Sequence, residues 1–87
     1  YFSKACADYI QAKQLKPDVI QTHDWQTGLV PLLLKEQIPV LFTIHNLHYQ
    51  GLCDKYHLDF LGLKEDPKII QEGLVNCTKA GIVHSQA

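Results

Sequence analysis

The hydrophobic positions of the chain follow two different patterns. Residues 18–22 and 40–45 contain short runs rich in β-branched residues, and the second run is apolar on both faces, which is typical of buried strands. Residues 3–15, 26–37 and 68–84 carry apolar side chains three and four positions apart, and this spacing predicts helices. Continuous apolar strands that alternate with helices form βαβ units. The pattern therefore predicts an α/β fold with a parallel pair of strands.

The segment from His45 to Leu63 has no clear period, and it contains Gly51 and Gly62. We expect a long loop with one short helical turn near residues 57–61 and no continuous helix over residues 46–56. A connection of this length inside a small domain usually carries function. Glycines also weaken the helix predicted after it, which can therefore be two helices.

Composition limits the classes of partner. The chain has 87 residues, a formal net charge of −1 and a sequence isoelectric point near 6.5. A chain of this length forms one small domain, and its charge offers no basic surface for nucleic acid or for an anionic membrane. No apolar run reaches the roughly 18 residues that a membrane span needs. The missing initiator Met and the ending at Ala87 favour an internal piece of a longer protein.

The three cysteines, Cys6, Cys53 and Cys77, are odd in number and fit neither a CxxC motif nor a disulfide framework. We expect reduced thiols in a compartment of the cytosolic type, with Cys6 and Cys77 as small buried hydrophobic residues.

Polar side chains follow each predicted strand at the point where it ends. His23-Asp24-Trp25 follows the first strand, and the segment from His45 to Gly51 follows the second. Ligands of open parallel sheets bind outside the carboxyl ends of the strands. Imidazole, carboxylate and amide groups beside aromatic rings suit a polyhydroxylated ligand, which needs many hydrogen bonds and a flat apolar wall.

Each of these residues also has a structural interpretation. His23 can cap the strand end, and Asp24 can be the N-cap of the following helix. Trp25 is expected to pack in the core, and Gly51 to supply only a positive φ. The remaining residues can be loop formers or solvent-exposed: His45, Asn46, His48 and His57. Neither HExxH nor CxxC spacing is present, so we expect no metal site.

Three segments resemble one known family. Residues 17–29, PDVIQTHDWQTGL, are similar to the PDVIHxHDWHT segment of glycogen and starch synthases. Residues 42–51, FTIHNLHYQG, are similar to their FTIHNLAYQG segment, and residues 73–83 resemble their block of the type INFLKAGIVYAD. Together these segments span most of the chain and resemble the bacterial and plastid type that uses ADP-glucose.

The resemblance implies a fold and an activity. Residues 1–87 would be an internal part of the N-terminal domain, a Rossmann-like parallel-sheet portion of a two-domain glycosyltransferase of the GT-B type. The parent would transfer glucose from ADP-glucose to the non-reducing end of an α-1,4-glucan, with retention and without metal or cofactor. The groups that stabilise the leaving diphosphate lie outside these residues, so the isolated chain would be inactive. The compartment would be the bacterial cytoplasm or, alternatively, the plastid.

The resemblance also implies roles for individual residues. His23 and Asn76 would be catalytic residues that contact the donor glucose. The loop after the second strand would line the cleft near the acceptor, and the implied substrate-binding residues are Asp24, His45, Asn46, Tyr49, Gln50 and Gly51. Two alternatives stay open: another two-domain glycosyltransferase, and a single α/β module that binds sugar without turnover.

Overall fold

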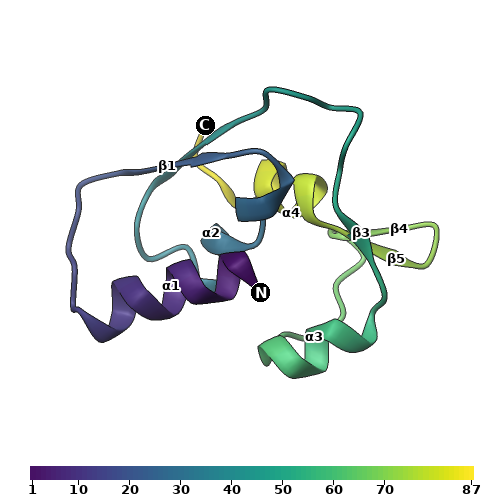
Figure 1. Ribbon diagram of the computed structural model, residues 1–87, viewed down its shortest axis with the longest axis horizontal. Helices are drawn as coiled ribbons and strands as arrows, with labels where there is room; N and C mark the ends of the chain where they lie inside the picture. Colours follow the sequence, from purple (N-terminus) through teal and green to yellow (C-terminus); the bar gives the residue numbers. More distant parts are fainter.

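The computed structural model describes all residues, 1–87. In chain order the elements are α1 (Phe2–Ala12), β1 (Ile20–His23), the 3-10 helix η1 (Trp25–Thr27), α2 (Val30–Leu33), β2 (Val40–Thr43), β3 (Leu52–Cys53), α3 (Tyr56–Leu61), β4 (Ile70–Gln71), β5 (Leu74–Asn76) and α4 (Cys77–His84), as Figure 1 shows. No helix combines the length and the apolar character that crossing a membrane requires.

Strands β1 and β2 pair in parallel, which confirms the predicted strands and their direction. Their register runs from Ile20 opposite Val40 to His23 opposite Thr43, so both strands end at the same edge. The last two residues lie along the other side of β2, where the Phe42 amide donates to the Ala87 carbonyl over 2.8 Å.

One face of this strand pair is covered by helices. Ile20 packs against a cluster formed by α1 and α2, whose buried members are Ala7, Val30 and Leu34. The ring of Phe42 lies so close to α4 that a β-carbon on Gly81 would meet it at 2.7 Å. On the opposite face Gln21, His23 and Leu41 are exposed. The polar strand ends are therefore open to solvent on that face.

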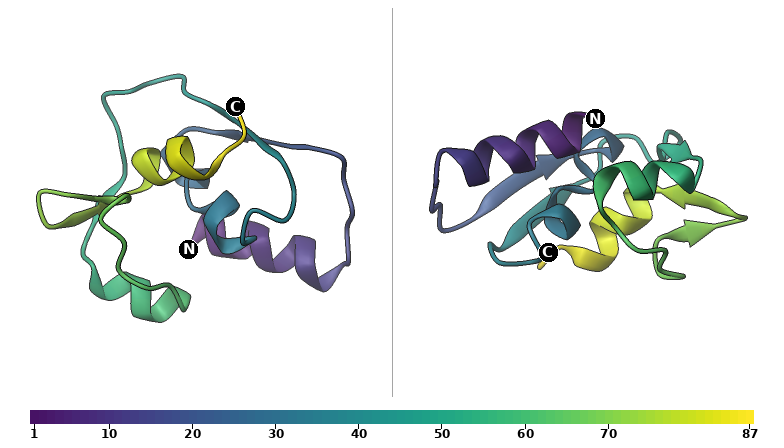
Figure 2. Two further views of the ribbon diagram at one scale, coloured as in Figure 1. Left: turned by 180° about the vertical axis from the view of Figure 1, so that it is seen from behind. Right: turned by 90° about the horizontal axis from the view of Figure 1, so that it is seen from below.

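A second, antiparallel sheet has the strand order β3-β5-β4 and lies at the far end of the molecule from α1, as Figure 2 shows. It packs with α3 and α4 around the larger core cluster, whose buried members are Leu29, Leu58, Ile69, Val75, Cys77 and Ala80. Cys77 is buried, as predicted, whereas Cys6 is only half-buried.

The helix predicted over residues 68–84 is wrong in its first half. Residues Glu72 and Gly73 have φ values of 52° and 79°, which makes them the two central residues of a tight hairpin turn between β4 and β5. The apolar residues on either side fit a helical period equally well, so periodicity alone chose the wrong structure. Only α4 is helical, and it begins after Asn76.

The other predicted elements need smaller corrections. The helix expected over residues 26–37 reduces to η1 and α2, because Lys35 and Glu36 adopt left-handed φ values of 54° and 55° that end it. Pro31 lies in the first turn of α2, as expected. The first helix ends at Ala12, short of residue 15. The short turn near residues 57–61 is confirmed as α3, whereas β3 was not predicted.

Candidate functional site

The carboxyl ends of β1 and β2 bring four predicted site residues together. We call His23, Asp24, His45 and Asn46 the polar cluster. Nδ1 of His23 lies 2.9 Å from Nε2 of His45, and the two ring planes are nearly parallel, with an interplanar angle of 19° and centroids 5.2 Å apart. Both imidazoles are exposed. Residues 22 positions apart in the chain thus form one hydrogen-bonded pair on the open face of the sheet.

The pairing restricts what the two rings can offer a ligand. One proton lies between Nδ1 of His23 and Nε2 of His45, so one ring donates and the other accepts. In the neutral pair, the two remaining ring nitrogens are therefore one donor and one acceptor. A sugar hydroxyl both donates and accepts, so this combination suits it.

Asp24 connects the two strand ends. Its Oδ1 accepts hydrogen bonds from the backbone amides of His45 at 2.7 Å and Asn46 at 3.2 Å. It occupies the N-cap position of η1, but its side chain makes no capping hydrogen bond to that helix. The hydrogen bond from the His45 amide lowers the pKa of Asp24 below its ordinary value of 3.8, and the nearby imidazoles act in the same direction. Asp24 therefore stays a carboxylate at neutral pH.

Thr27 holds His23 in place, and sequence reasoning missed this role. Its Oγ1 accepts the backbone N–H of His23 at 2.9 Å and lies 2.9 Å from the His23 carbonyl. The hydroxyl folds η1 back onto the end of β1, as Ser and Thr side chains do in turns. A threonine four residues after a strand-end histidine was the available signal.

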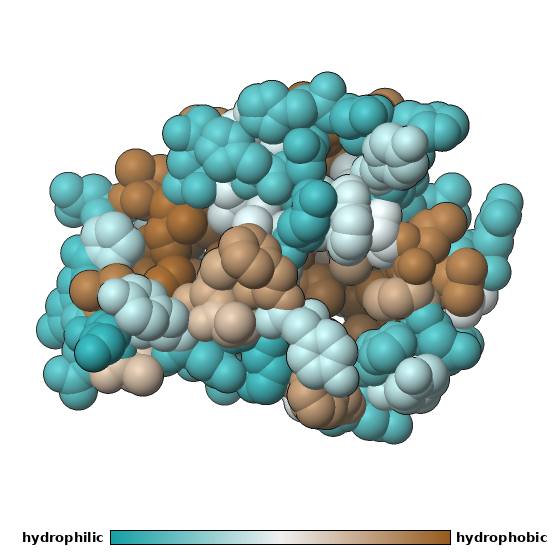
Figure 3. All heavy atoms as spheres, viewed as in Figure 1, coloured by the Kyte–Doolittle hydropathy of each residue, from teal (hydrophilic) through white to brown (hydrophobic).

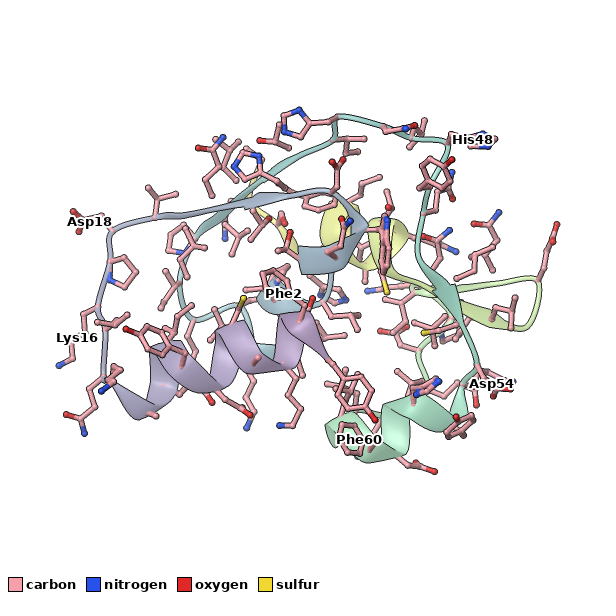
Figure 4. The ribbon with its side chains drawn as sticks, in the orientation of Figure 1. Phe2, Lys16, Asp18, His48, Asp54 and Phe60 are labelled. Carbon is pink, nitrogen blue, oxygen red and sulfur yellow. The ribbon has the colours of Figure 1, made fainter.

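The segment from His45 to Gly51, the 45–51 loop, leaves the polar cluster without regular structure. The Asn46 side chain accepts from the His48 amide at 3.0 Å, and Gln50 Nε2 donates to the Leu47 carbonyl at 3.0 Å. Figure 4 shows the His48 side chain directed outward at a corner of this loop. Tyr49 is 63% exposed and packs edge-on against His48.

Asn76 lies behind the loop and is 1% exposed. Its Nδ2 donates to Oε1 of Gln50 at 2.8 Å and to Oε1 of Gln71 at 2.6 Å. Its Oδ1 accepts from the Lys79 amide at 2.9 Å, which makes it the N-cap of α4. Its polar atoms thus all have partners within the chain. The direct contact with glucose that the resemblance implies stays a prediction.

A cavity of about 670 Å³ adjoins the 45–51 loop. Trp25 lines it and lies against Gly51, whose φ is +67°. The tryptophan is 36% exposed, so its expected place in the core is wrong. Phe2 of α1 and Phe60 of α3, both labelled in Figure 4, line the cavity from other elements. Figure 3 shows hydrophobic residues in a hollow just right of the centre of the view. No Asp, Glu, Lys or Arg lines the cavity.

Charge and metal ligands are sparse around the site. No three His, Cys, Asp or Glu side chains lie close enough together to hold a metal ion. All eight basic residues are lysines, and none of them hydrogen-bonds to the polar cluster. The site consequently offers neutral hydrogen-bonding groups and one carboxylate.

Parallel strands with helices on one face, and polar side chains at the strand ends, define an α/β protein of the parallel-sheet class. The family model of the starch synthase catalytic domain matches residues 1–87, and the chain belongs to this family.

Individual relatives agree with this assignment. The chain is 43% identical over 101 residues to the glycogen synthase of Exiguobacterium sibiricum, an alignment that covers 98% of this chain and 21% of the relative. It is 43% identical over 94 residues to the glycogen synthase of Aquifex aeolicus, covering 97% of this chain and 20% of that relative.

The structure is similar to the catalytic domain of starch synthase IV from Arabidopsis thaliana, which was solved bound to ADP and acarbose. The TM-score is 0.84 at 31% sequence identity, over 98% of this chain and 20% of that one. The chain thus spans about a fifth of the length of the proteins that it matches.

Proposed function

We propose that residues 1–87 form an internal, Rossmann-like part of the N-terminal domain of a two-domain glycogen or starch synthase. The parent enzyme transfers glucose from ADP-glucose to the non-reducing end of an α-1,4-glucan, with retention. The observation that carries the proposal is that the polar cluster lies at the strand ends of a chain that matches the starch synthase catalytic domain over its whole length. The named relatives and the ADP-bound structural neighbour support the same reaction and donor.

In this proposal the polar cluster binds sugar hydroxyls. The His23–His45 pair presents one donor and one acceptor, and Asp24 fixes the backbone of His45. Tyr49, Gln50 and Gly51 belong to the acceptor side, beside the uncharged cavity. An uncharged, aromatic-lined surface suits a neutral glucan, whose sugar faces pack on rings. The three free cysteines suit a reducing compartment, the bacterial cytoplasm or the plastid.

The isolated chain should not turn over substrate. Transfer from a nucleotide sugar needs positive groups at the leaving diphosphate, and such electrostatic stabilisation is usually the largest catalytic contribution. The chain contains no arginine, and its lysines make no hydrogen bond to the polar cluster. We propose that these groups come from other parts of the parent.

The test is an assay of the full-length parent with ADP-glucose and with UDP-glucose on glycogen. Incorporation of glucose into glycogen, with a higher kcat/KM for ADP-glucose, is the expected result. Binding of maltooligosaccharides without turnover of either donor would instead favour a sugar-binding module. A preference for UDP-glucose would support the proposed glucosyl transfer but contradict ADP-glucose as the donor.

A further inference from the structure

The first turn of α4 faces the 45–51 loop. The Cys77 amide donates to the Gly51 carbonyl at 3.2 Å, and the Thr78 amide donates to the Gln50 carbonyl at 3.1 Å. The next amide, that of Lys79, is bound by the Asn76 side chain. The amides at the start of a helix have no partner inside the helix. Here three of them are satisfied by the loop and by the cap.

A chain of side-chain hydrogen bonds runs parallel to these backbone contacts. The Leu47 carbonyl accepts from Nε2 of Gln50, whose Oε1 accepts from Nδ2 of Asn76. The same Nδ2 reaches Gln71 on β4, and Nζ of Lys79 donates to the Ile70 carbonyl at 2.9 Å. The loop is therefore connected to the antiparallel sheet through one buried amide.

Gln50 is the residue through which this connection acts on the loop. It braces the turn at Leu47 with one end of its side-chain amide and contacts Asn76 with the other. Gln50 is half-buried, whereas Asn76 is buried. A buried amide with all of its partners in place rigidifies its surroundings, and losing one partner leaves a buried group unsatisfied.

We propose that Asn76 is a positioning residue of the 45–51 loop, which it holds through Gln50 in the conformation that binds the glucan acceptor. This inference rests on the proposed function, because it assigns the loop to the acceptor side. In this proposal Asn76 acts on the acceptor through Gln50, in place of the direct contact with the donor glucose that the resemblance implies.

Serine at position 76 separates the two parts of this role. Asn76→Ser keeps a side-chain oxygen that can cap α4, since Ser and Asn are similarly good N-caps, but it removes the amide that holds Gln50. Gln50→Ala breaks the same contact from the other side, at a half-buried residue that belongs to neither hydrophobic core cluster. Gln71→Ala is the matched control, because it removes the second partner of Asn76 and leaves the loop contact intact.

The experiment measures steady-state kinetics of the full-length parent and of the three single variants, with ADP-glucose as donor and glycogen as acceptor. Asn76→Ser and Gln50→Ala are each expected to raise the KM for glycogen by about tenfold, the value of one net hydrogen bond, with the KM for ADP-glucose unchanged. The double variant Asn76→Ser/Gln50→Ala should be no worse than either single variant, because both act through one contact. Gln71→Ala should stay within about twofold of wild type.

Amide hydrogen exchange of the same proteins gives a second readout. Asn76→Ser should speed exchange of the Cys77 and Thr78 amides by about tenfold, because their acceptors lie on the loop. Wild-type glycogen KM with unchanged exchange would overturn the proposal, as would additive effects in the double variant. A loss confined to kcat or to the KM for ADP-glucose would instead place Asn76 on the donor sugar. A wild-type parent without transfer activity would refute the proposed function, and the exchange data would still decide whether Asn76 holds the loop.

Discussion

The ring of Trp25 lies directly against Gly51, so that a β-carbon on Gly51 would meet ring carbon Cε3 at 2.5 Å. Gly51 also has a φ of +67°, which side-chain-bearing residues rarely adopt. The glycine therefore does more than permit a turn. It lets the 45–51 loop pass across the face of a large ring at the edge of the cavity.

Replacing Gly51 with alanine should destabilise the full-length protein by about 2–4 kcal/mol, the sum of backbone strain and overpacking against Trp25. Gly73→Ala is the matched control. Gly73 has a φ of +79° but no atom within 4 Å of its hypothetical β-carbon, so we expect only strain of about 1 kcal/mol. Urea unfolding of both variants measures the difference. Equal losses of unfolding free energy in the two variants would show that Trp25 moves aside at no energetic cost.

His23→Ala should lower kcat of the parent by about 30- to 1,000-fold, as expected for the loss of about 2–4 kcal/mol of hydrogen bonding in the transition state. His45→Ala should lower kcat by a similar factor. The loss of kcat in the double variant should be much smaller than the product of the two single losses, because the rings act as one hydrogen-bonded pair. Turnover at saturating ADP-glucose, with a thermal melt of each variant, measures this. A wild-type kcat with a lowered Tm would give His23 a purely structural role.

The carboxylate of Asp24 should make the free energy of unfolding fall at acidic pH. Its pKa is lowered in the folded state, chiefly by the His45 amide, so its contribution is complete above the ordinary value of 3.8 and is lost as the pH falls through the folded value. We expect Asp24→Asn to be less stable than wild type at pH 7, and the difference to shrink at pH 3. Urea titrations at the two pH values check this. An identical difference at both would contradict the role of the charge.

The Cys77 thiol should resist alkylation. Burial raises its pKa from the ordinary 9.0 to about 12, and the hydrogen-bonded neighbour Cys53 acts in the same direction. At pH 8 about one thiol in 10⁴ is then ionised, and the thiolate is the reactive form. Iodoacetamide followed by peptide mass spectrometry should label the half-buried Cys6 at least about tenfold faster than Cys77. Rapid labelling of Cys77 in the folded protein would show that this site opens.

The same shift affects stability at alkaline pH. The unfolded chain loses the Cys77 proton first, so the free energy of unfolding should fall as the pH rises from about 9 towards 12, and Cys77→Ala should remove this part of the slope. Equal slopes in the two proteins would contradict it.

The sequence predicted what depends on local pattern and failed where distant contacts decide. The strands near residues 20 and 40 follow from their apolar runs, and their parallel pairing follows from the helices between them. The turn at Glu72 and Gly73 was missed because the flanking residues also fit a helical period. Trp25 was placed in the core by its size, since nothing in the sequence reveals that Gly51 lies against its ring.

The candidate site shows the same division. Polar residues after each strand marked the correct edge of the sheet, because parallel strands end together. The bond between His23 and His45 depends on the register of the two strands, which no residue type encodes. The burial of Asn76 depends on the hairpin before it, so its position could not be derived while that segment was predicted as helix.

The contacts between the 45–51 loop and the start of α4 can form only late while the chain is being synthesised. Gln50 and Gly51 leave the ribosome before Cys77 and Thr78, whose amides their carbonyls accept. At about 5–20 residues per second, the interval of 26–28 residues lasts roughly 1–6 s. The strand pair that holds the histidines can form within this interval, but the loop has none of its partners on α4. The nascent chain therefore exposes an unanchored loop for seconds before α4 fixes it.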